Sequence, residues 1–164
     1  GGFITVRSQP GAGSIFRIHI PVSDKDVTSD DEVSEVLITG HETILVVEDE
    51  KDIAGLTKKM LEVLGYRVFV AGSGQEAVAI YMEKTGAIDL VILDMVMPGM
   101  SGAKTFETLK EINHTVKVLL ASGFSMDENM RQLMDSGCKG FLPKPFTMAK
   151  LSRKVREVLD VNKS

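Results

Sequence analysis

The sequence predicts a doubly wound α/β fold in which helices cover both faces of a five-stranded parallel sheet. From about residue 42 onward, five strand-like apolar runs alternate with five helix-like segments, and such alternation is typical of a parallel sheet covered by helices. The third run, Leu90-Val91-Ile92-Leu93, is apolar throughout, as expected for a strand that is buried on both faces. A β-hairpin is expected ahead of this domain.

The expected strands and helices follow one another in strict alternation. The strands are expected at residues 43–47, 66–71, 88–93, 116–121 and 140–142. The helices are expected at residues 51–64, 74–84, 103–113, 127–136 and 147–159. Gly65 and Gly137 are positioned to end two of these helices, and Thr147 is the expected N-cap of the last one. The first helix carries an apolar face made of Ile53, Leu56, Met60, Leu61 and Leu64.

Two further segments precede the α/β domain, which is expected at residues 42–160. Residues 1–22 contain two β-rich stretches, 3–8 and 14–20, on either side of turn-forming residues, so they are expected to form a hairpin. Residues 23–41 are rich in Asp and Glu and have few apolar side chains in their first half. This composition is typical of a solvated linker.

The bulk composition is that of a globular domain. The 164 residues are 43% hydrophobic and 26% charged, which is ordinary for such proteins. The net charge of −4 argues against a nucleic-acid surface, which usually carries a basic patch. No apolar run approaches the ~18 residues of a membrane helix, so no membrane contact is expected. A single cysteine, Cys138, favours a cytoplasmic location. The chain lacks an initiator methionine and is interpreted as a fragment of a longer protein.

Polar side chains follow four of the predicted strands. Glu48 and Asp49 follow the first strand, Asp94 the third, Ser122 the fourth and Lys144 the fifth. In an open parallel sheet these strand ends meet at the edge where ligands bind. Clustered carboxylates repel one another, and a cation removes that conflict. Oxygen ligands favour Mg²⁺, so the pattern predicts a metal-assisted phosphate site.

Several of these residues also have structural explanations when they are taken singly. Glu48 and Asp49 could cap the helix that begins near Asp52. Ser122 precedes a glycine, which is common in turns. Lys144 lies between two prolines and could be an ordinary surface lysine, although its bond to the following proline is a candidate for the cis form.

Four motifs together resemble the receiver domain of two-component response regulators. They are Ile44-Leu45-Val46-Val47-Glu48-Asp49-Glu50, Leu93-Asp94-Met95-Val96-Met97-Pro98, Ala121-Ser122-Gly123 and Lys144-Pro145-Phe146. The resemblance spans residues 42–159, with every motif in the expected order. It implies a flavodoxin-like sheet with strand order 2-1-3-4-5. It also implies transfer of a phosphoryl group from a phosphohistidine, carried by a partner kinase or phosphotransfer domain, followed by slow hydrolysis.

The resemblance implies a phosphoacceptor and a set of metal ligands. Asp94 would accept the phosphoryl group and would also contact the metal. Asp49 would bind Mg²⁺ (or Mn²⁺) directly, and Glu48 would help directly or through water. The backbone carbonyl of Val96 would be a further ligand. Aspartate is frequent in the family at the position of Glu48, so the longer glutamate departs from the usual pattern.

The remaining implied roles concern charge stabilisation and switching. Lys144 would pair with the acceptor carboxylate and then with phosphoryl oxygens, while Ser122 would hydrogen-bond a phosphoryl oxygen. Phe141 would be the switch aromatic that turns inward, and it lacks the hydroxyl that a tyrosine would supply. We also hypothesise that the apolar side chains of Val96 and Phe124 slow the entry of water.

A partner surface is a further expectation from family behaviour. Met130 and Met134, together with Phe141 and the last helix, are expected to line a surface used for a homodimer or for partner contact. The three histidines, at positions 19, 41 and 114, are interpreted as structural rather than as phosphorylation sites.

The first 22 residues carry a second resemblance. The stretches Gly1-Gly2-Phe3-Ile4-Thr5-Val6-Arg7-Ser8, Gly11-Ala12-Gly13-Ser14-Ile15-Phe16 and Ile20-Pro21 resemble the last two strands of a histidine-kinase ATP-binding domain. This order implies a hybrid sensor histidine kinase. The rest of the nucleotide site is missing from the chain, so the fragment is expected to catalyse only its own phosphorylation and dephosphorylation.

Three other functions compete with this interpretation. Gly72-Ser73-Gly74-Gln75-Glu76-Ala77 fits a dinucleotide fingerprint, but it follows the second strand instead of the first. A phosphatase with an aspartyl nucleophile would usually carry a second acid where this chain has Val96. A docking module that is never phosphorylated would not need the full set of acids, serine and lysine.

Overall fold

The computed structural model describes residues 2–22, 36–123 and 128–160. The chain divides into two compact units, residues 1–35 and 36–164. In the first unit, β1 (Phe3–Gln9) pairs with β2 (Gly13–His19) in an antiparallel hairpin. Every residue of both strands is exposed, and the ring of Phe3 stacks on that of His19 at 4.4 Å. The predicted hairpin is therefore confirmed.

The second unit contains a five-stranded parallel sheet. Its strands are β3 (Thr43–Val47), β4 (Arg67–Ala71), β5 (Leu90–Asp94), β6 (Val118–Ser122) and β7 (Gly140–Pro143). They are arranged in the order β4-β3-β5-β6-β7, and every pair is parallel. This is the expected order 2-1-3-4-5, so the predicted fold class is confirmed.

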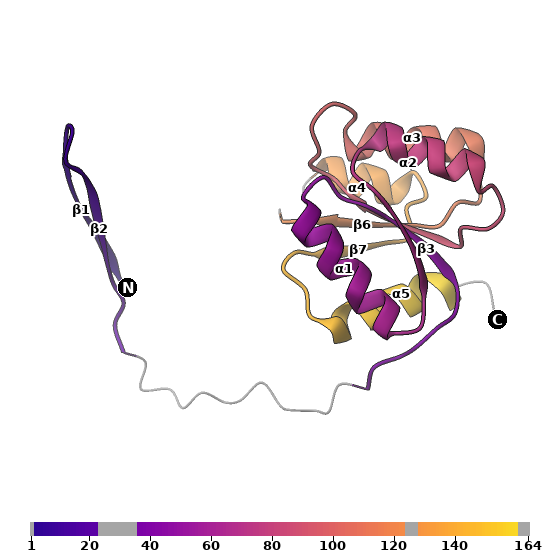
Figure 1. Ribbon diagram of the computed structural model, residues 1–164, viewed down its shortest axis with the longest axis horizontal. Coiled ribbons are helices and arrows are strands. Elements are labelled where there is room, and N and C mark those ends of the chain that lie inside the picture. The colour runs from indigo at the N-terminus through magenta and orange to yellow at the C-terminus, as the bar shows by residue number, and fades with distance from the viewer. Residues whose placement is uncertain (1, 23–35, 124–127, 161–164) are drawn as a thin grey trace. The chain divides into compact units, whose positions relative to one another are not determined.

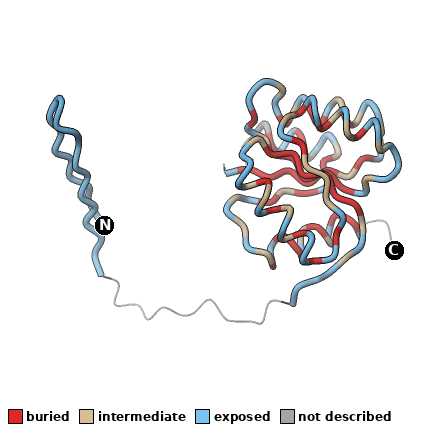
Figure 2. Tube along the Cα trace, in the orientation of Figure 1, coloured by how far each residue is buried: buried red, intermediate tan, exposed pale blue. Residues whose placement is uncertain are grey.

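Helices cover both faces of the sheet (Figure 1). On one face lie α1 (Lys51–Val63) and α5 (Met148–Asp160). On the other lie α2 (Gly74–Glu83), α3 (Gly102–Ile112) and α4 (Glu128–Asp135). Each face has its own apolar core, and the three central strands are buried along their whole length (Figure 2). The apolar runs of the sequence are explained by this burial on two sides.

The predicted helix starts and faces are confirmed only in part. Lys150 donates its backbone N–H to Thr147 Oγ1 at 3.2 Å, which confirms the predicted N-cap of the last helix. The N-cap of α1 is Glu50, so the alternative that Glu48 or Asp49 caps this helix is wrong. The predicted apolar face of α1 includes Leu56, yet this residue is 55% exposed.

The methionines of α4 differ from the expected surface. Met130 is only 3% exposed and belongs to the core beneath α2, α3 and α4. The prediction that it lines a partner surface is therefore wrong, because its side chain fills the core. Met134 is partly buried against the same core. Phe124, the proposed water barrier, lies outside the described residues.

Residues 36–42 run along the α1 and α5 side of the second unit. The hydroxyl of Ser152 accepts a hydrogen bond from the Ile38 backbone N–H at 2.7 Å and donates one to the Ile38 carbonyl at 3.1 Å. Gly40 donates its N–H to the Leu64 carbonyl at 2.9 Å. Gly65 has a φ of +95°, and a Cβ there would lie 2.4 Å from the Gly40 carbonyl oxygen. The close crossing of these two backbones therefore requires glycine.

Candidate functional site

The carboxyl edge of the sheet brings together the acids that the sequence places there. Glu48 and Asp49 follow β3, and Asp94 is the last residue of β5. One carboxylate oxygen from each of the three lies within 4.8 Å of the others. Glu48 and Asp94 are buried, while Asp49 is half-buried. This oxygen-only set fits a hard divalent cation such as Mg²⁺.

Lys144 enters the same cluster from the end of β7. Its Nζ lies 2.5 Å from Glu48 Oε2 and 3.0 Å from Asp94 Oδ2. Its backbone N–H donates to the Ser122 carbonyl at 2.8 Å. This hydrogen bond fixes the position of the Lys144 backbone relative to the end of β6. The Lys144–Pro145 bond is cis, as the sequence suggested. Lys144 is thus an ion-pair partner of two acids and not a plain surface lysine.

The ionisation of this cluster follows from burial and pairing. Burial disfavours the charged ammonium of Lys144, but hydrogen bonds to Glu48 and Asp94 outweigh it and raise the pKa of Lys144. Burial raises the pKa of Glu48, and the contact with Lys144 offsets that effect only in part. Lys144 therefore stays charged. Its ammonium is the positive charge that contacts the two buried acids, Glu48 and Asp94.

The loop after β5 shapes the mouth of the site. Asp94 Oδ1 accepts a 3.3 Å hydrogen bond from the Val96 backbone N–H. The side chain of Val96 is 59% exposed, whereas Met97 next to it is buried. The loop therefore exposes an apolar side chain two residues after Asp94.

Two further predicted site residues lie close to the sheet. Ser122 is the last residue of β6 and is only 1% exposed. Its register partner on β7 is Pro143, the residue before Lys144. Phe141, on β7, is partly buried and packs against the core beneath α2, α3 and α4. The hydroxyl and the aromatic ring thus lie on the two neighbouring strands that end at the site.

Gly102 is a residue of the site region that sequence reasoning missed. It begins α3, directly after the N-cap Ser101. A Cβ at Gly102 would lie 2.4 Å from the carbonyl oxygen of Asp94 and 2.7 Å from the Cα of Met95. Glycine is a poor helix former, so a glycine at a helix start was the available signal. The helix can approach the strand end that carries Asp94 only because this residue has no side chain.

The apparent dinucleotide fingerprint has a structural explanation. Ser73 Oγ accepts a hydrogen bond from the Glu76 backbone N–H at 3.2 Å, and Glu76 Oε2 accepts one from the Gly72 N–H at 2.8 Å. This pattern is related to a capping box, but the Glu76 carboxylate accepts from Gly72, one residue before the N-cap Ser73. It places a carboxylate where a phosphate would bind. A Cβ at Gly74 would lie 2.2 Å from Thr105 Oγ1. The glycine therefore serves the packing of α2 on α3.

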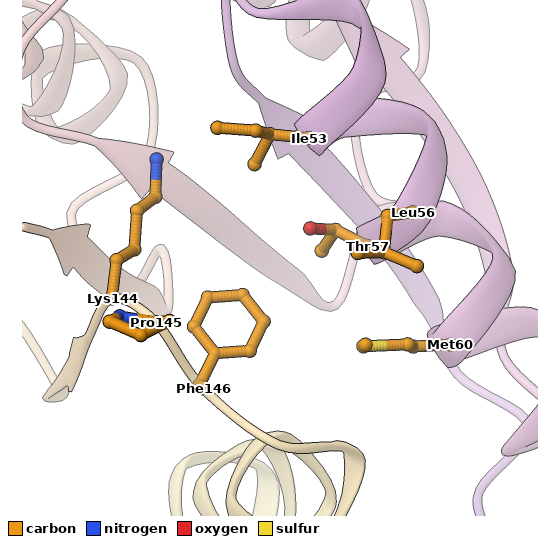
Figure 3. Close-up of a pocket in the computed structure, with 7 residues that line it drawn as sticks. All are labelled: Ile53, Leu56, Thr57, Met60, Lys144, Pro145 and Phe146. Carbon is orange, nitrogen blue, oxygen red and sulfur yellow. The ribbon is translucent and has the colours of Figure 1, made fainter.

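A groove of about 330 Å³ opens beside the site. Its walls are α1 on one side and the residues after β7 on the other (Figure 3). The lining residues are Ile53, Leu56, Thr57, Met60, Lys144, Pro145 and Phe146. Leu56 is exposed because its side chain lines this open groove. Since Lys144 belongs to both the groove and the acid cluster, a protein bound in the groove would lie next to the acids.

No helix in the described parts of the chain combines the length and the apolar composition that crossing a membrane requires.

The comparisons with known proteins agree on the fold and on the family. Residues 44–156 match the response regulator receiver domain family. The sensor kinase CckA of Brucella abortus is 34% identical over 98% of this chain, which spans 18% of the length of that kinase. A receiver domain structure from Clostridium thermocellum is 33% identical, with a TM-score of 0.71 over 74% of this chain and 97% of that one.

A second solved structure connects the fold to hybrid kinases. The receiver domain of the hybrid histidine kinase CckA is 33% identical, with a TM-score of 0.61 over 71% of this chain and 98% of that one. The matched residues include all of the sheet except Thr43, together with the acid cluster at its carboxyl edge. The chain therefore belongs to the response regulator receiver domain family of two-component signalling systems.

Proposed function

We propose that Asp94 accepts a phosphoryl group from a phosphohistidine on a partner kinase or phosphotransfer domain. The observation that carries this proposal is the position of the Lys144 ammonium, which contacts Asp94 and Glu48 at the end of the sheet. A carboxylate held beside a fixed cation, in a cluster of three acids, is suited to a reaction that adds negative charge.

The divalent cation would be held by this chain's oxygens. Asp49, Glu48 and Asp94 would supply carboxylate oxygens, and Val96 would supply its backbone carbonyl. Mg²⁺ is the preferred ion, and Mn²⁺ would satisfy the same oxygen donors. When bound, the ion neutralises the acids and stabilises negative charge on the transferred group.

The protein groups then position and stabilise the transferred phosphoryl group. An Asp94 carboxylate oxygen forms a bond to phosphorus as the phosphorus–nitrogen bond to the partner's histidine breaks, and the electron pair of that bond stays on the imidazole. Lys144 and Ser122 stabilise the equatorial oxygens, where charge accumulates in a loose transition state. Hydrolysis of the acyl phosphate by water later restores Asp94, and the exposed Val96 side chain slows that step. Phe141 would follow Ser122 inward and report the phosphorylated state on the surface.

The wider organisation is part of the same proposal. Residues 1–22 would be the end of a histidine-kinase ATP-binding domain, 23–41 a linker, and 42–160 the receiver. The similarity to a sensor kinase along 98% of this chain supports that order. The parent would then be a cytoplasmic or membrane-anchored hybrid kinase, and its phosphorylated receivers would form a homodimer or contact a partner.

Mass spectrometry after incubation with acetyl phosphate and Mg²⁺ tests the function. We expect one added phosphoryl group on the peptide that contains Asp94, and none in an Asp94→Asn variant. A chain that stays unmodified while its fold is intact would support the docking-module alternative instead.

A further inference from the structure

The two faces of the sheet are covered by helices of opposite net charge. On one face, α1 and α5 carry seven basic and four acidic side chains, a net charge of +3. Glu42, which pairs with Arg156 of α5, lowers this value to +2. On the other face, α2 and α3 carry two basic and four acidic side chains, a net charge of −2. The whole chain has a net charge of −4, so the face covered by α1 and α5 is a basic region of an acidic chain.

Two lysines on this basic face are not used in ion pairs of the domain itself. Lys59 of α1 and Lys150 of α5 are exposed, and neither side chain pairs with an acid in the parts of the chain that the structure describes. Lys58, by contrast, lies with Nζ 3.7 Å from Glu62 Oε1. Exposed charges contribute little to the stability of their own domain, but they attract a partner of opposite charge. Both lysines are therefore available to an acidic partner.

Three consecutive apolar residues also lie on this face. Val36, Leu37 and Ile38 are 83%, 45% and 41% exposed, and they begin the segment 36–42, which we call the strap. The hydroxyl of Ser152 on α5 is fully buried and holds the Ile38 backbone through two hydrogen bonds. A run of exposed apolar residues usually marks a binding surface. Because the strap is already fixed, a partner would not have to order it.

The strap continues the groove that runs along α1. Met60 lines the groove, and Leu64, one helical turn further along α1, accepts a hydrogen bond from Gly40 of the strap. Four residues of a helix span about 6 Å. The opposite end of the groove is Lys144, which contacts the acid cluster. The strap precedes residues 44–156, which match the receiver family, so its apolar side chains add to the surface of the shared fold.

We propose that this face docks the phosphohistidine-bearing domain through an acidic surface that surrounds an apolar patch. Phosphoryl transfer brings the partner's histidine to Asp94, at the Lys144 end of the groove, so the domain that carries it has to cover the neighbouring surface. Its acids meet Lys59 and Lys150, and its apolar patch meets the groove and Leu37. The inference rests on the proposed phosphotransfer and adds the chemistry of the partner's surface.

Charge reversal tests the acidic character of the partner. Lys59→Glu and Lys150→Glu should each slow phosphotransfer from the phosphorylated parent kinase about threefold to tenfold in dilute buffer. The difference from wild type should disappear at about 1 M salt, where the screening length is only ~3 Å. Lys104→Glu makes the same change in net charge on α3, where the side chain is 59% exposed. That control should transfer at nearly the wild-type rate.

Replacement of an apolar side chain tests the strap. Leu37→Ser should slow transfer from the kinase about fivefold, because an apolar contact is lost, and the loss should persist at high salt. Met82→Ser is the matched control, since Met82 is 60% exposed on α2, on the other face of the sheet. It should have no effect on transfer. Circular dichroism of each variant checks that the fold is retained.

Acetyl phosphate, which needs no docked protein, separates this inference from the function on which it rests. It should phosphorylate all of these variants at nearly the wild-type rate. A wild-type chain that neither donor phosphorylates would overturn the proposed function together with the docking surface. Normal reaction with acetyl phosphate, combined with unchanged transfer from the kinase in Lys59→Glu, Lys150→Glu and Leu37→Ser, would overturn the docking surface alone. If these three variants instead dissociated a dimer in analytical ultracentrifugation without slowing transfer, the face would bind a second copy of the chain, which also contradicts the inference.

Discussion

Single residues set the backbone spacing around Asp94, the proposed phosphoacceptor. Gly102 allows the start of α3 to touch the backbone of Asp94, where a Cβ would lie 2.4 Å from the carbonyl oxygen. Distances below 3.0 Å to backbone atoms cannot be relieved by rotating a side chain. Any larger residue at this position must move either the helix or the strand end that carries Asp94.

Gly102→Ala should therefore destabilise the domain by about 2 kcal/mol or more, as overpacking of a tight contact does. Urea unfolding followed by circular dichroism measures the change. Gly55→Ala in α1 is the matched control, because a Cβ there has no neighbour within 4 Å. That control should be neutral or should stabilise by about 0.5–1 kcal/mol, since alanine is the better helix former. Equal losses in both variants would contradict the role given to Gly102.

The residue scale also shows where sequence reasoning stops. Apolar periodicity located the strand ends well enough to place Glu48, Asp49, Asp94 and Lys144 at one edge, because parallel strands must end together. The short contact between Glu48 and Lys144 depends on side-chain conformation and could not be predicted. A glycine at a helix start is a local signal at Gly102, but it does not encode how closely α3 approaches the end of β5, and the collision depends on that distance.

At the scale of elements, residues 36–42 and α5 form one packed unit. Arg156 of α5 lies with Nη1 2.8 Å from both carboxylate oxygens of Glu42, while its Nη2 lies 2.5 Å from Asp160 Oδ1. Burial opposes the ionisation of Glu42, yet the hydrogen bonds from Arg156 and from backbone N–H groups outweigh it and lower the pKa of Glu42. The segment before β3 is thereby tied to the last helix.

This tie predicts a pH dependence of stability. A carboxylate whose pKa is lowered on folding stabilises the protein fully above its unfolded pKa, about 4.3, and that contribution is lost as pH falls through the lower folded pKa. Glu42→Gln should cost about 1.5–3 kcal/mol at neutral pH, the range for hydrogen bonds to charged groups. The difference from wild type should shrink toward zero in acid. Urea unfolding at several pH values checks this, and a difference that stays constant into acid would exclude the ion pair as its source.

The groove along α1 is the second element-scale feature. Lys144 connects the groove to the acid cluster, so the phosphohistidine-bearing domain is its proposed occupant. Leu56 lines the groove and is 55% exposed, whereas Val63 on the same helix is 70% exposed and is absent from the lining. The two residues form a matched pair for testing the groove.

Leu56→Glu should slow phosphotransfer from the phosphorylated parent kinase at least about tenfold, because a charge would have to be buried against apolar groove walls. Phosphorylation by acetyl phosphate, which needs no docked protein, should be unchanged. Val63→Glu should leave both reactions near the wild-type rate. Transfer from the kinase that is equally fast in all three chains would rule out the groove as the docking surface.

Element boundaries show the same limits of sequence reasoning. The strand predicted to begin at residue 88 begins at Leu90. Asp89 Oδ2 instead accepts a hydrogen bond from the Thr43 N–H at 2.8 Å. This bond connects the residue before β5 to the first residue of β3. The strand predicted to begin at residue 66 begins at Arg67, because Tyr66 donates its N–H to the Leu61 carbonyl at the end of α1. Long-range contacts decide these ends, whereas burial on both faces made the strands themselves predictable.

At the scale of the whole molecule, the folded domain contains a cluster of like charges that lowers its own stability. Three acids meet at the end of a sheet whose central strands are fully buried. Lys144 compensates two of them through direct contacts, but the three carboxylates still outnumber it. Like charges so close together destabilise the folded state, and the apolar cores on the two faces of the sheet must outweigh that cost.

The stability of the whole domain should therefore depend on Mg²⁺ through Asp49. Mg²⁺ at a hundredfold excess over its dissociation constant should stabilise the wild type by about 2.7 kcal/mol. Asp49→Asn should raise the stability of the metal-free domain by about 1 kcal/mol, the usual scale of a single mutation, and should remove most of the Mg²⁺-dependent gain. Glu111→Gln, at an exposed position on α3, should leave that gain intact. Urea unfolding of the three chains with and without Mg²⁺ measures both effects. If Asp49→Asn retained the full gain, Asp49 would not be a metal ligand, and the cation would have to be held by Glu48 and Asp94 instead.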